Sequence, residues 1–488
     1  MIRQAKRANG RQIDMTTGPL FGNILRFMLP IILTNLLQHF YHATDIIIVG
    51  LSPELDAVGA VGSTSTFLTL INNLFIGFSV GANVVVARNI GLKDRDAVSR
   101  GVHTSICMSL MFGVLGAVIG IVLTRPVLIG MGYTGTLLTL AIRYSYIYLA
   151  CLPFLSLTNF LASILRAQGD AQTPLYVLTA TGLLNIVLNF IFVKFVGLSV
   201  EGVALATAIA NLASAVILWY HLAKHDTDCR VSFAKLRVHR DQFLEIARIG
   251  FPAGIQNALF SLSNMLIQSS ILQVNNALTP PNSEYAPIIK GNTATGSLES
   301  FIFNALAATT VAASTFTAQN IGAKKCRRAR TALIQISLIS TVIAVVMTVA
   351  GFLFKTPLLA LYGVKQADDL LSTLCYDTAL IRMIWKWPAF FIYAIMNACA
   401  GTIRGLGKST TSAVITFFGT CVFRIVWIYT VFRYFENLES IYISYPISWL
   451  ITGIFFLAVV SFLLRKRIRE EDAKRQASEE STPVPAEA

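Results

Sequence analysis

Polar side chains recur along residues 35–50, a stretch that is otherwise apolar enough to lie in lipid and reads "NLLQHFYHATDIIIVG". On a helix with 100° per residue, Gln38, Tyr41, His42 and Asp45 share an arc of about 100°. An ionisable group near the middle of a membrane costs about 2.5–3.5 kcal/mol on insertion scales, so it must face protein or water. We therefore expect this face of the helix to line a water-filled cavity.

Asn35 and His39 flank this polar face, and two alternatives to a cavity stay open. Asp45 lies five residues before Gly50, where the apolar run ends, so its carboxylate could simply reach headgroup water. His39, His42 and Asp45 could instead bind a transition metal, although histidines on a cavity wall more often form hydrogen bonds. The apolar residues that continue beyond Asp45 favour the cavity, and we predict no metal site.

Two later stretches could bring neutral oxygen ligands to this carboxylate. Asn185 and Asn189 are spaced i, i+4 and so lie on one face of a helix, and Thr207 follows in a segment rich in small residues that pack closely. Each of these residues alone could equally make an ordinary hydrogen bond between helices. Only their convergence with Asp45 would make a site.

The second half of the chain has two further acids that lie in apolar surroundings, Glu299 and Asp377. We include both among the candidates for a substrate cavity, with Gln38, His42 and Asn35. For Glu299 a helix interface is an equal alternative. For Asp377 the alternative is an imperfect ion pair with Arg382, five residues further on.

The elements that carry these residues must be membrane-spanning helices. Of the 488 residues, 55% are hydrophobic and 13% are charged, and apolar stretches of about 20 residues recur along nearly the whole chain. Backbone groups in lipid must be satisfied within the segment, which favours helices. The sequence predicts an all-α polytopic membrane protein with twelve spans, at about 22–50, 58–86, 102–124, 137–162, 175–197, 202–223, 246–275, 295–319, 331–353, 373–400, 410–432 and 441–464.

The net charge of +14 indicates orientation and not nucleic-acid binding. Clusters of Lys and Arg follow the second, sixth, eighth and twelfth spans, whereas the loops at 51–56 and 197–202 have neither residue. This positive-inside asymmetry predicts that both termini lie in the cytosol. No apolar core precedes Pro19, so we expect no cleavable signal peptide. The seven cysteines form no C-x-x-C pair and none lies in a predicted external loop, so we expect no disulfides to hold the fold together.

Three motifs occur once in each half of the chain. R-x-x-x-P-x-x-x-x-N begins at 26 and 248, A-x-N-I-G-x-K at 87 and 318, and A-x-x-x-R-x-x-G-x-x-x-T at 162 and 400. Because six spans separate the copies, the two halves have the same orientation in the membrane and should face each other across a central cavity. The predicted organisation is a cytosolic tail (1–20), an N-lobe (21–224), a cytosolic inter-lobe loop (225–244), a C-lobe (245–465) and a disordered cytosolic tail (466–488).

Taken together, these motifs resemble the multidrug and toxic compound extrusion (MATE) transporter family, within a wider superfamily of drug, oligosaccharidyl-lipid and polysaccharide exporters. The resemblance covers about residues 20–465 and rests on "LPIILTNLLQHFYHATDIIIVG", "NVVVARNIGLKD", "ILRAQGDAQTP", "NIVLNFIFV" and "STFTAQNIGAKK". It implies two six-helix lobes and an N-lobe ion site at Asp45, with Tyr41, Asn185 and Thr207 as companions. It also implies that Gln38 lies near the drug, whereas Asn189 stands where several members have a second aspartate.

The resemblance implies a secondary active antiporter that exports organic cations in exchange for protons or sodium ions. The alternative is a flippase for lipid-linked oligosaccharides, which would need a basic cavity to bind pyrophosphate. Basic residues at membrane depth are few, which favours the exporter; they are Arg143, Lys194, Arg382, Lys386 and Arg424. We expect no enzyme activity and no cofactor besides the coupling ion, and we expect a monomer of the bacterial cytoplasmic membrane that contacts lipids and small organic cations.

Overall fold

The computed structural model describes residues 12–480, except 51, 53, 55, 131, 281–285 and 368, and a few side chains within α2, α8 and α17. Every regular element among these residues is a helix. The first half contains α1 (Leu20–Val49), α2 (Ala57–Leu92), α3 (Arg95–Gly130), α4 (Gly135–Ala150), α5 (Leu152–Ala167), α6 (Gln172–Phe190) and α7 (Val200–Lys224). The second half contains α8 (Arg240–Leu278), α9 (Pro287–Gly322), α10 (Cys326–Leu353), α11 (Lys355–Leu361), α12 (Leu370–Lys386), α13 (Phe390–Gly405), α14 (Ser409–Thr416), α15 (Phe423–Trp427), α16 (Arg433–Phe435) and α17 (Leu438–Glu480). Short π-helical turns, η1 (Ile191–Phe195), η4 (Phe417–Val422) and η5 (Ile428–Phe432), and short 3-10 turns, η2 (Phe233–Lys235) and η3 (Trp387–Ala389), extend or join them.

Several of these elements are pieces of one span. The pair α4 and α5 is bent by 46° at Cys151, two residues before Pro153, whose ring removes a backbone donor from the first turn of α5. Joining such pieces leaves twelve helical segments in the described part of the chain, at the positions of the twelve predicted spans, and the predicted all-α polytopic fold is confirmed. Among the described residues, ten helices are long and apolar enough to cross a membrane, and the bent pair is an eleventh. The remaining segment, α8, is not among these because its many Asn and Gln residues make it less apolar than those helices.

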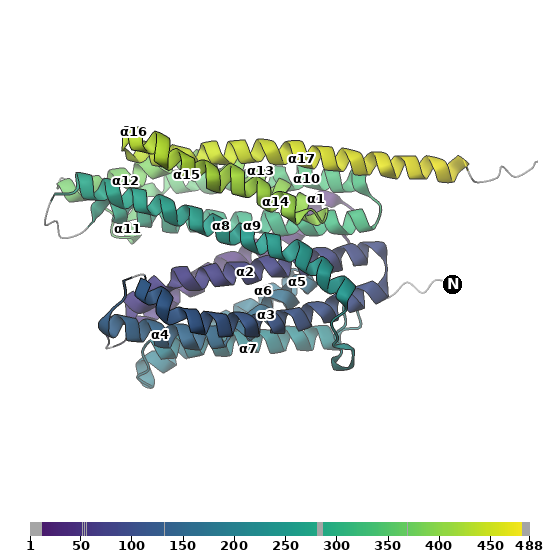
Figure 1. Ribbon diagram of the computed structural model, residues 1–488, viewed down its shortest axis with the longest axis horizontal. Helices are drawn as coiled ribbons and strands as arrows, with labels where there is room; N and C mark the ends of the chain where they lie inside the picture. The colour runs from purple at the N-terminus through teal and green to yellow at the C-terminus, as the bar shows by residue number, and fades with distance from the viewer. Residues whose placement is uncertain are drawn as a thin grey trace, which may run out of the picture.

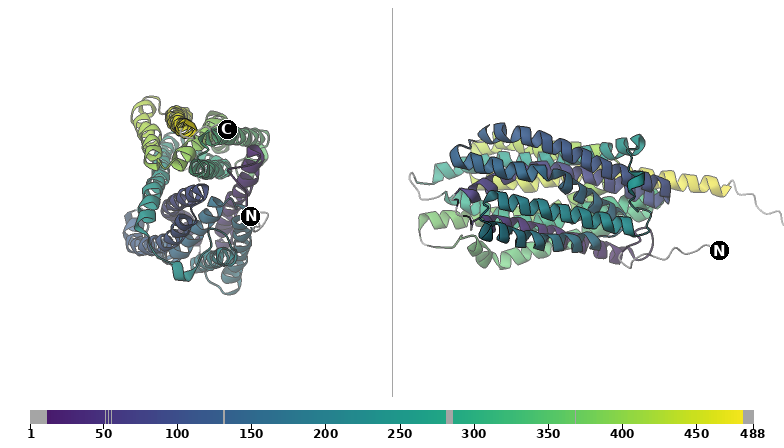
Figure 2. Two further views of the ribbon diagram at one scale, coloured as in Figure 1. Left: turned by 90° about the vertical axis from the view of Figure 1, so that its right-hand side faces the viewer. Right: turned by 90° about the horizontal axis from the view of Figure 1, so that it is seen from below.

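The helices form two groups that follow the two halves of the chain. In Figure 1 the helices α2 to α7 lie in the lower part of the bundle and α10 to α17 lie above them, with the helix axes roughly horizontal. The view along the helix axes in Figure 2 shows the same two groups. The first described residues and the projecting end of α17 lie at the same end of the bundle, as the predicted topology requires.

The sequence repeat is also a structural repeat. The lysines that end the A-x-N-I-G-x-K motif, Lys93 and Lys324, both adopt a left-handed backbone, with φ of 59° and 55°. The glycines of the third motif, Gly169 and Gly407, do the same, with φ of 90° and 78°. Equivalent positions in the two halves therefore terminate their helices in the same way.

The two lobes touch through glycines that lie from the middle of the bundle to the end that is predicted to face the cytosol. A Cβ added to Gly77 of α2 would overlap the backbone of Gly254 in α8. The glycines of the repeated motif are reciprocal, because a Cβ on Gly91 would overlap Gln319 and a Cβ on Gly322 would overlap Arg88. We call Gly77, Gly91, Gly254 and Gly322 the glycine seam; it brings backbones closer than any side chain would permit.

The structure corrects the predicted C-terminal tail and adds contacts to the N-terminal one. The last helix continues to Glu480, although the sequence suggested disorder from residue 466. Contacts with the start of α10 explain this, because Glu471 accepts a hydrogen bond from the Cys326 amide at 2.8 Å and Asp472 pairs with Arg327 at 3.0 Å. At the other end, residues 12–19 are packed and not free: Ile13 donates to Gly169 in the N-lobe, and Met15 accepts from Asn320 in the C-lobe.

Candidate functional site

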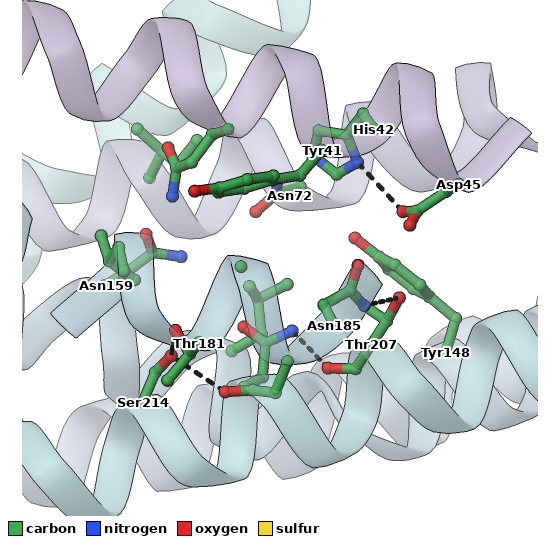
Figure 3. Close-up of a pocket in the computed structure, with 17 residues that line it drawn as sticks. Tyr41, His42, Asp45, Asn72, Tyr148, Asn159, Thr181, Asn185, Thr207 and Ser214 are labelled. Atoms are coloured by element: carbon green, nitrogen blue, oxygen red, sulfur yellow. Dashed lines mark hydrogen bonds and ion pairs between the residues drawn. The ribbon is translucent and has the colours of Figure 1, made fainter. Parts of the chain in front are cut away.

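Asp45 lies near the C-terminal end of α1 and is buried. It lines a cavity of about 140 Å³ whose walls come from α1, α2, α4, α5, α6 and α7. Among the described residues that line this cavity, Asp45 is the only acid, and none is Lys or Arg. In Figure 3 Tyr41, His42 and Asp45 lie on one side and face Asn185, Thr207 and Ser214 on the other.

Neutral amides and a hydroxyl surround the carboxylate. Asn189, which is fully buried, donates from Nδ2 to Asp45 Oδ1 at 2.5 Å. Asn185 satisfies its neighbours best with Nδ2 toward Asp45 Oδ1, 3.0 Å away, and Oδ1 toward the Thr207 hydroxyl, 3.3 Å away. The i, i+4 spacing on α6 thus places both amides against Asp45, and Thr207 on α7 completes the row.

The rest of the polar face on α1 forms the opposite wall. The ring of Tyr41 lies against Gly182 of α6, where no side chain would fit, and its hydroxyl donates to the Thr179 carbonyl at 3.3 Å. Nδ1 of His42 lies 3.9 Å from Asp45 Oδ2, and the His42 side chain is 66% exposed. Gln38 lies one turn before His42, is exposed, and also lines the cavity.

Asn35 and His39 turn away from this cavity and contact the C-lobe. Asn35 donates to the carbonyl of Asn304 in α9 at 3.0 Å, and the His39 ring packs edge-on against Phe301 at 4.8 Å between ring centroids. Among the described residues no group of three His, Cys, Asp or Glu side chains could hold a metal ion. Asn35 therefore lies between the lobes in this state, and its role in a cavity stays a prediction.

Several cavity residues were not singled out from the sequence. Thr181 and Ser214 share a hydrogen bond of 2.7 Å, and the other additions are Asn72, Tyr148, Asn159 and Asn211. Thr181 lies four residues before Asn185, so extending the i, i+4 row on α6 by one turn would have found it. The others come from helices whose orientation the sequence does not reveal.

The two acids of the second half lie outside this cavity. Glu299 of α9 is buried and accepts hydrogen bonds from Arg382 at 2.6 Å, Lys386 at 2.5 Å and Trp387 at 3.2 Å. Asp377 is exposed on α12. Arg382 pairs with Glu299 and not with Asp377, because a separation of five residues places Arg382 and Asp377 on different faces of α12.

The chain is similar to known membrane transporters over nearly its whole length. The family model described as MatE matches residues 30–191 and 290–430. The probable multidrug resistance protein YoeA of Bacillus subtilis (strain 168) is 24% identical over 457 residues, which cover 90% of this chain and 93% of that protein. The probable multidrug resistance protein NorM of Thermotoga maritima is 25% identical over 417 residues, which cover 85% of this chain and 86% of that protein.

A solved structure gives the same result for the fold. It is described as the outward-facing conformation of a multidrug resistance MATE family transporter of the MOP superfamily. It is 21% identical in sequence and matches with a TM-score of 0.83 over 94% of this chain and 99% of that chain. The two chains share one fold.

Proposed function

The chain belongs to the MatE family, and from that premise we propose that it is a secondary active antiporter that exports organic cations and drugs in exchange for protons or sodium ions. Membership of this family makes the chain a multi-pass membrane transporter and not an enzyme. We place it in the cell membrane with both termini in the cytosol, and no cofactor takes part besides the coupling ion.

The observation that carries the proposal is the isolation of Asp45. It is the single carboxylate in a cavity whose other polar groups are amides, hydroxyls and a histidine, among the residues described. A lone negative charge in such a cavity attracts a cationic drug, because no basic aliphatic side chain in the wall competes for it.

Exchange follows from competition for this one charge. Burial disfavours the charged form of a carboxyl group, so a proton that enters from outside binds to Asp45 and cancels its attraction for the drug. A sodium ion can do the same, because oxygens are the hard ligands that such a cation prefers; Asp45 and Thr207 supply two, and the Asn185 amide would turn its oxygen toward the ion. Drug and coupling ion therefore exclude each other.

Transport also needs two arrangements of the lobes. The glycine seam brings α2 of one lobe against α8 and α9 of the other, and we propose that these contacts hold the lobes together on the side that we place in the cytosol. If the drug and the coupling ion bind the two arrangements with different affinity, each shifts the balance between them.

The test is transport into everted membrane vesicles that contain the chain. We expect a proton or sodium gradient to drive accumulation of a fluorescent organic cation such as ethidium, and collapse of the gradient to stop it. If no cation from a broad panel moves and a lipid-linked oligosaccharide is translocated, the flippase alternative replaces the exporter.

A further inference from the structure

Three of the five basic residues that the sequence places at membrane depth meet inside the C-lobe. Arg382 and Lys386 project from α12 and Arg424 from α15, and all three are buried or nearly so. Their only described acidic neighbour is Glu299, which both Arg382 and Lys386 contact at 2.6 and 2.5 Å. Because Glu299 is already paired with Arg382 and Lys386, Arg424 has no acidic partner among the described residues.

Arg424 is a buried charge with an unused donor. It is 1% exposed, and it donates from Nε to Ser448 Oγ at 3.1 Å and from Nη1 to Asn264 Oδ1 at 3.2 Å. Its Nη2 is buried and has no hydrogen-bond partner in the described part of the chain. A guanidinium does not lose its proton in proteins, so this charge cannot be relieved by neutralisation. Proteins pair such charges, because an unpaired one inside a membrane is strongly unfavourable.

Aromatic rings cover this charge without satisfying it. The Cζ atom of Arg424 lies 4.2 Å from the ring centroid of Tyr445, and Nζ of Lys386 lies 3.9 Å from the same centroid. Trp449, whose ring centroid is 6.0 Å from that of Tyr445, is fully buried, and its Nε1 also lacks a partner among the described residues. Two residues that each have an unused donor, one charged and one neutral, thus both pack near Tyr445. A ring face attracts a cation but offers no lone pair to these N–H groups.

We propose that Arg424 and Trp449 form part of a binding site for a small anionic group inside the C-lobe. The group is an inorganic anion or the acidic head of an amphipathic compound; either would neutralise Arg424 and accept the two unused hydrogen bonds. The site lies close to the boundary between the lobes, because α8 carries both Asn264, which contacts Arg424, and the seam residue Gly254. It does not depend on Asp45, which lies in the other lobe, so either proposal can fail without the other.

The site can be tested through stability, since a ligand that binds only the folded protein raises its unfolding temperature. The full chain, purified in uncharged dodecyl maltoside, is titrated at constant ionic strength with chloride, phosphate or octanesulfonate. Gluconate, which is too large and hydroxylated for a buried site, replaces the anion, and 1-octanol controls for the alkyl chain. We expect stabilisation above these references. A response to chloride or phosphate identifies an inorganic anion, and a response to octanesulfonate alone identifies the acidic head of an amphiphile.

Variants show whether the response arises at this site. Arg424→Gln should raise the Kd for the anion about ten- to a hundredfold, which is the factor that a hydrogen bond to a charged group usually contributes to affinity. Arg143→Gln is the matched control, because Arg143 already pairs with Glu201 at 3.2 Å in the N-lobe. No response in the natural chain, or an equal response in Arg424→Gln, would overturn the proposal.

A second pair of variants applies if Arg424→Gln does not fold. Trp449→Phe keeps the ring and removes the unused donor. Trp427→Phe removes a donor that is already bonded to the Ser440 carbonyl at 2.8 Å. The site predicts a weaker anion response only in Trp449→Phe. Equal responses in these two variants would contradict it.

Discussion

Glu299→Gln should destabilise the C-lobe far more than the same change at an exposed ion pair. Glu299 is 1% exposed and accepts four hydrogen bonds, two from Arg382 and one each from Lys386 and Trp387. The amide removes the charge that balances two buried cations and turns one acceptor into a donor that faces them. Breaking a buried ion pair from one side costs about 3–5 kcal/mol, a large part of a total stability of about 5–15 kcal/mol.

The assay is reversible unfolding in mixed micelles with increasing dodecyl sulfate, followed by tryptophan fluorescence. The control is Glu201→Gln, whose partner Arg143 is 57% exposed, so that its loss should cost about 1 kcal/mol or less. Lys386→Met added to Glu299→Gln should restore part of the loss, with a coupling energy of about 0.5–3 kcal/mol, because one orphaned cation is gone. A loss for Glu299→Gln no larger than that for Glu201→Gln would refute the reasoning.

Three further predictions concern the lobes, the topology and the ion site. Gly91→Ala should force the seam apart and lengthen spin-label distances between α2 and α9, whereas Gly22→Ala should not, because a Cβ at Gly22 meets nothing within 4 Å. Cysteine at exposed Thr134 should react with an impermeant maleimide on intact cells, and cysteine at exposed Lys235 only after permeabilisation; the reverse pattern would invert the topology. Asn189→Asp should change the pH profile of export and the preference between protons and sodium, because two adjacent carboxylates resist joint ionisation. An unchanged pH profile measured in vesicles would show that position 189 does not contact the coupling ion.

Helical spacing was enough to predict which polar residues of α1, and which of α6, share one face of their helix. The stripe of Gln38, Tyr41, His42 and Asp45 follows from 100° per residue, and so does the shared face of the two asparagines on α6. Asn35 lies on the edge of the same stripe but contacts α9, since the stripe enters the contact between the lobes at that point.

Helical spacing could not predict which residues of different helices pair with one another. Arg382 had an acid five residues before it in sequence, yet its partner comes from α9, because helix packing decides which faces meet. The extent of α17 depended in the same way on Glu471 and the start of α10, which a polar, charged segment does not indicate by itself. The close contact of Gly91 with Gln319 likewise needs both lobes in place, although the repeat marked Gly91 and Gly322 as equivalent.

The central claim is that drug and coupling ion compete for the charge of Asp45, and Asp45→Asn tests it most directly. The amide keeps the size and the hydrogen bond to Asn189 but cannot take up or release a proton. The variant should still insert in the membrane, because an amide costs less to bury than a carboxylate. Gradient-driven export of ethidium should be lost in Asp45→Asn vesicles and should persist at the natural rate in Asp377→Asn, whose carboxylate is exposed on α12. Export by Asp45→Asn at the natural rate, with unchanged dependence on the ion gradient, would contradict the account.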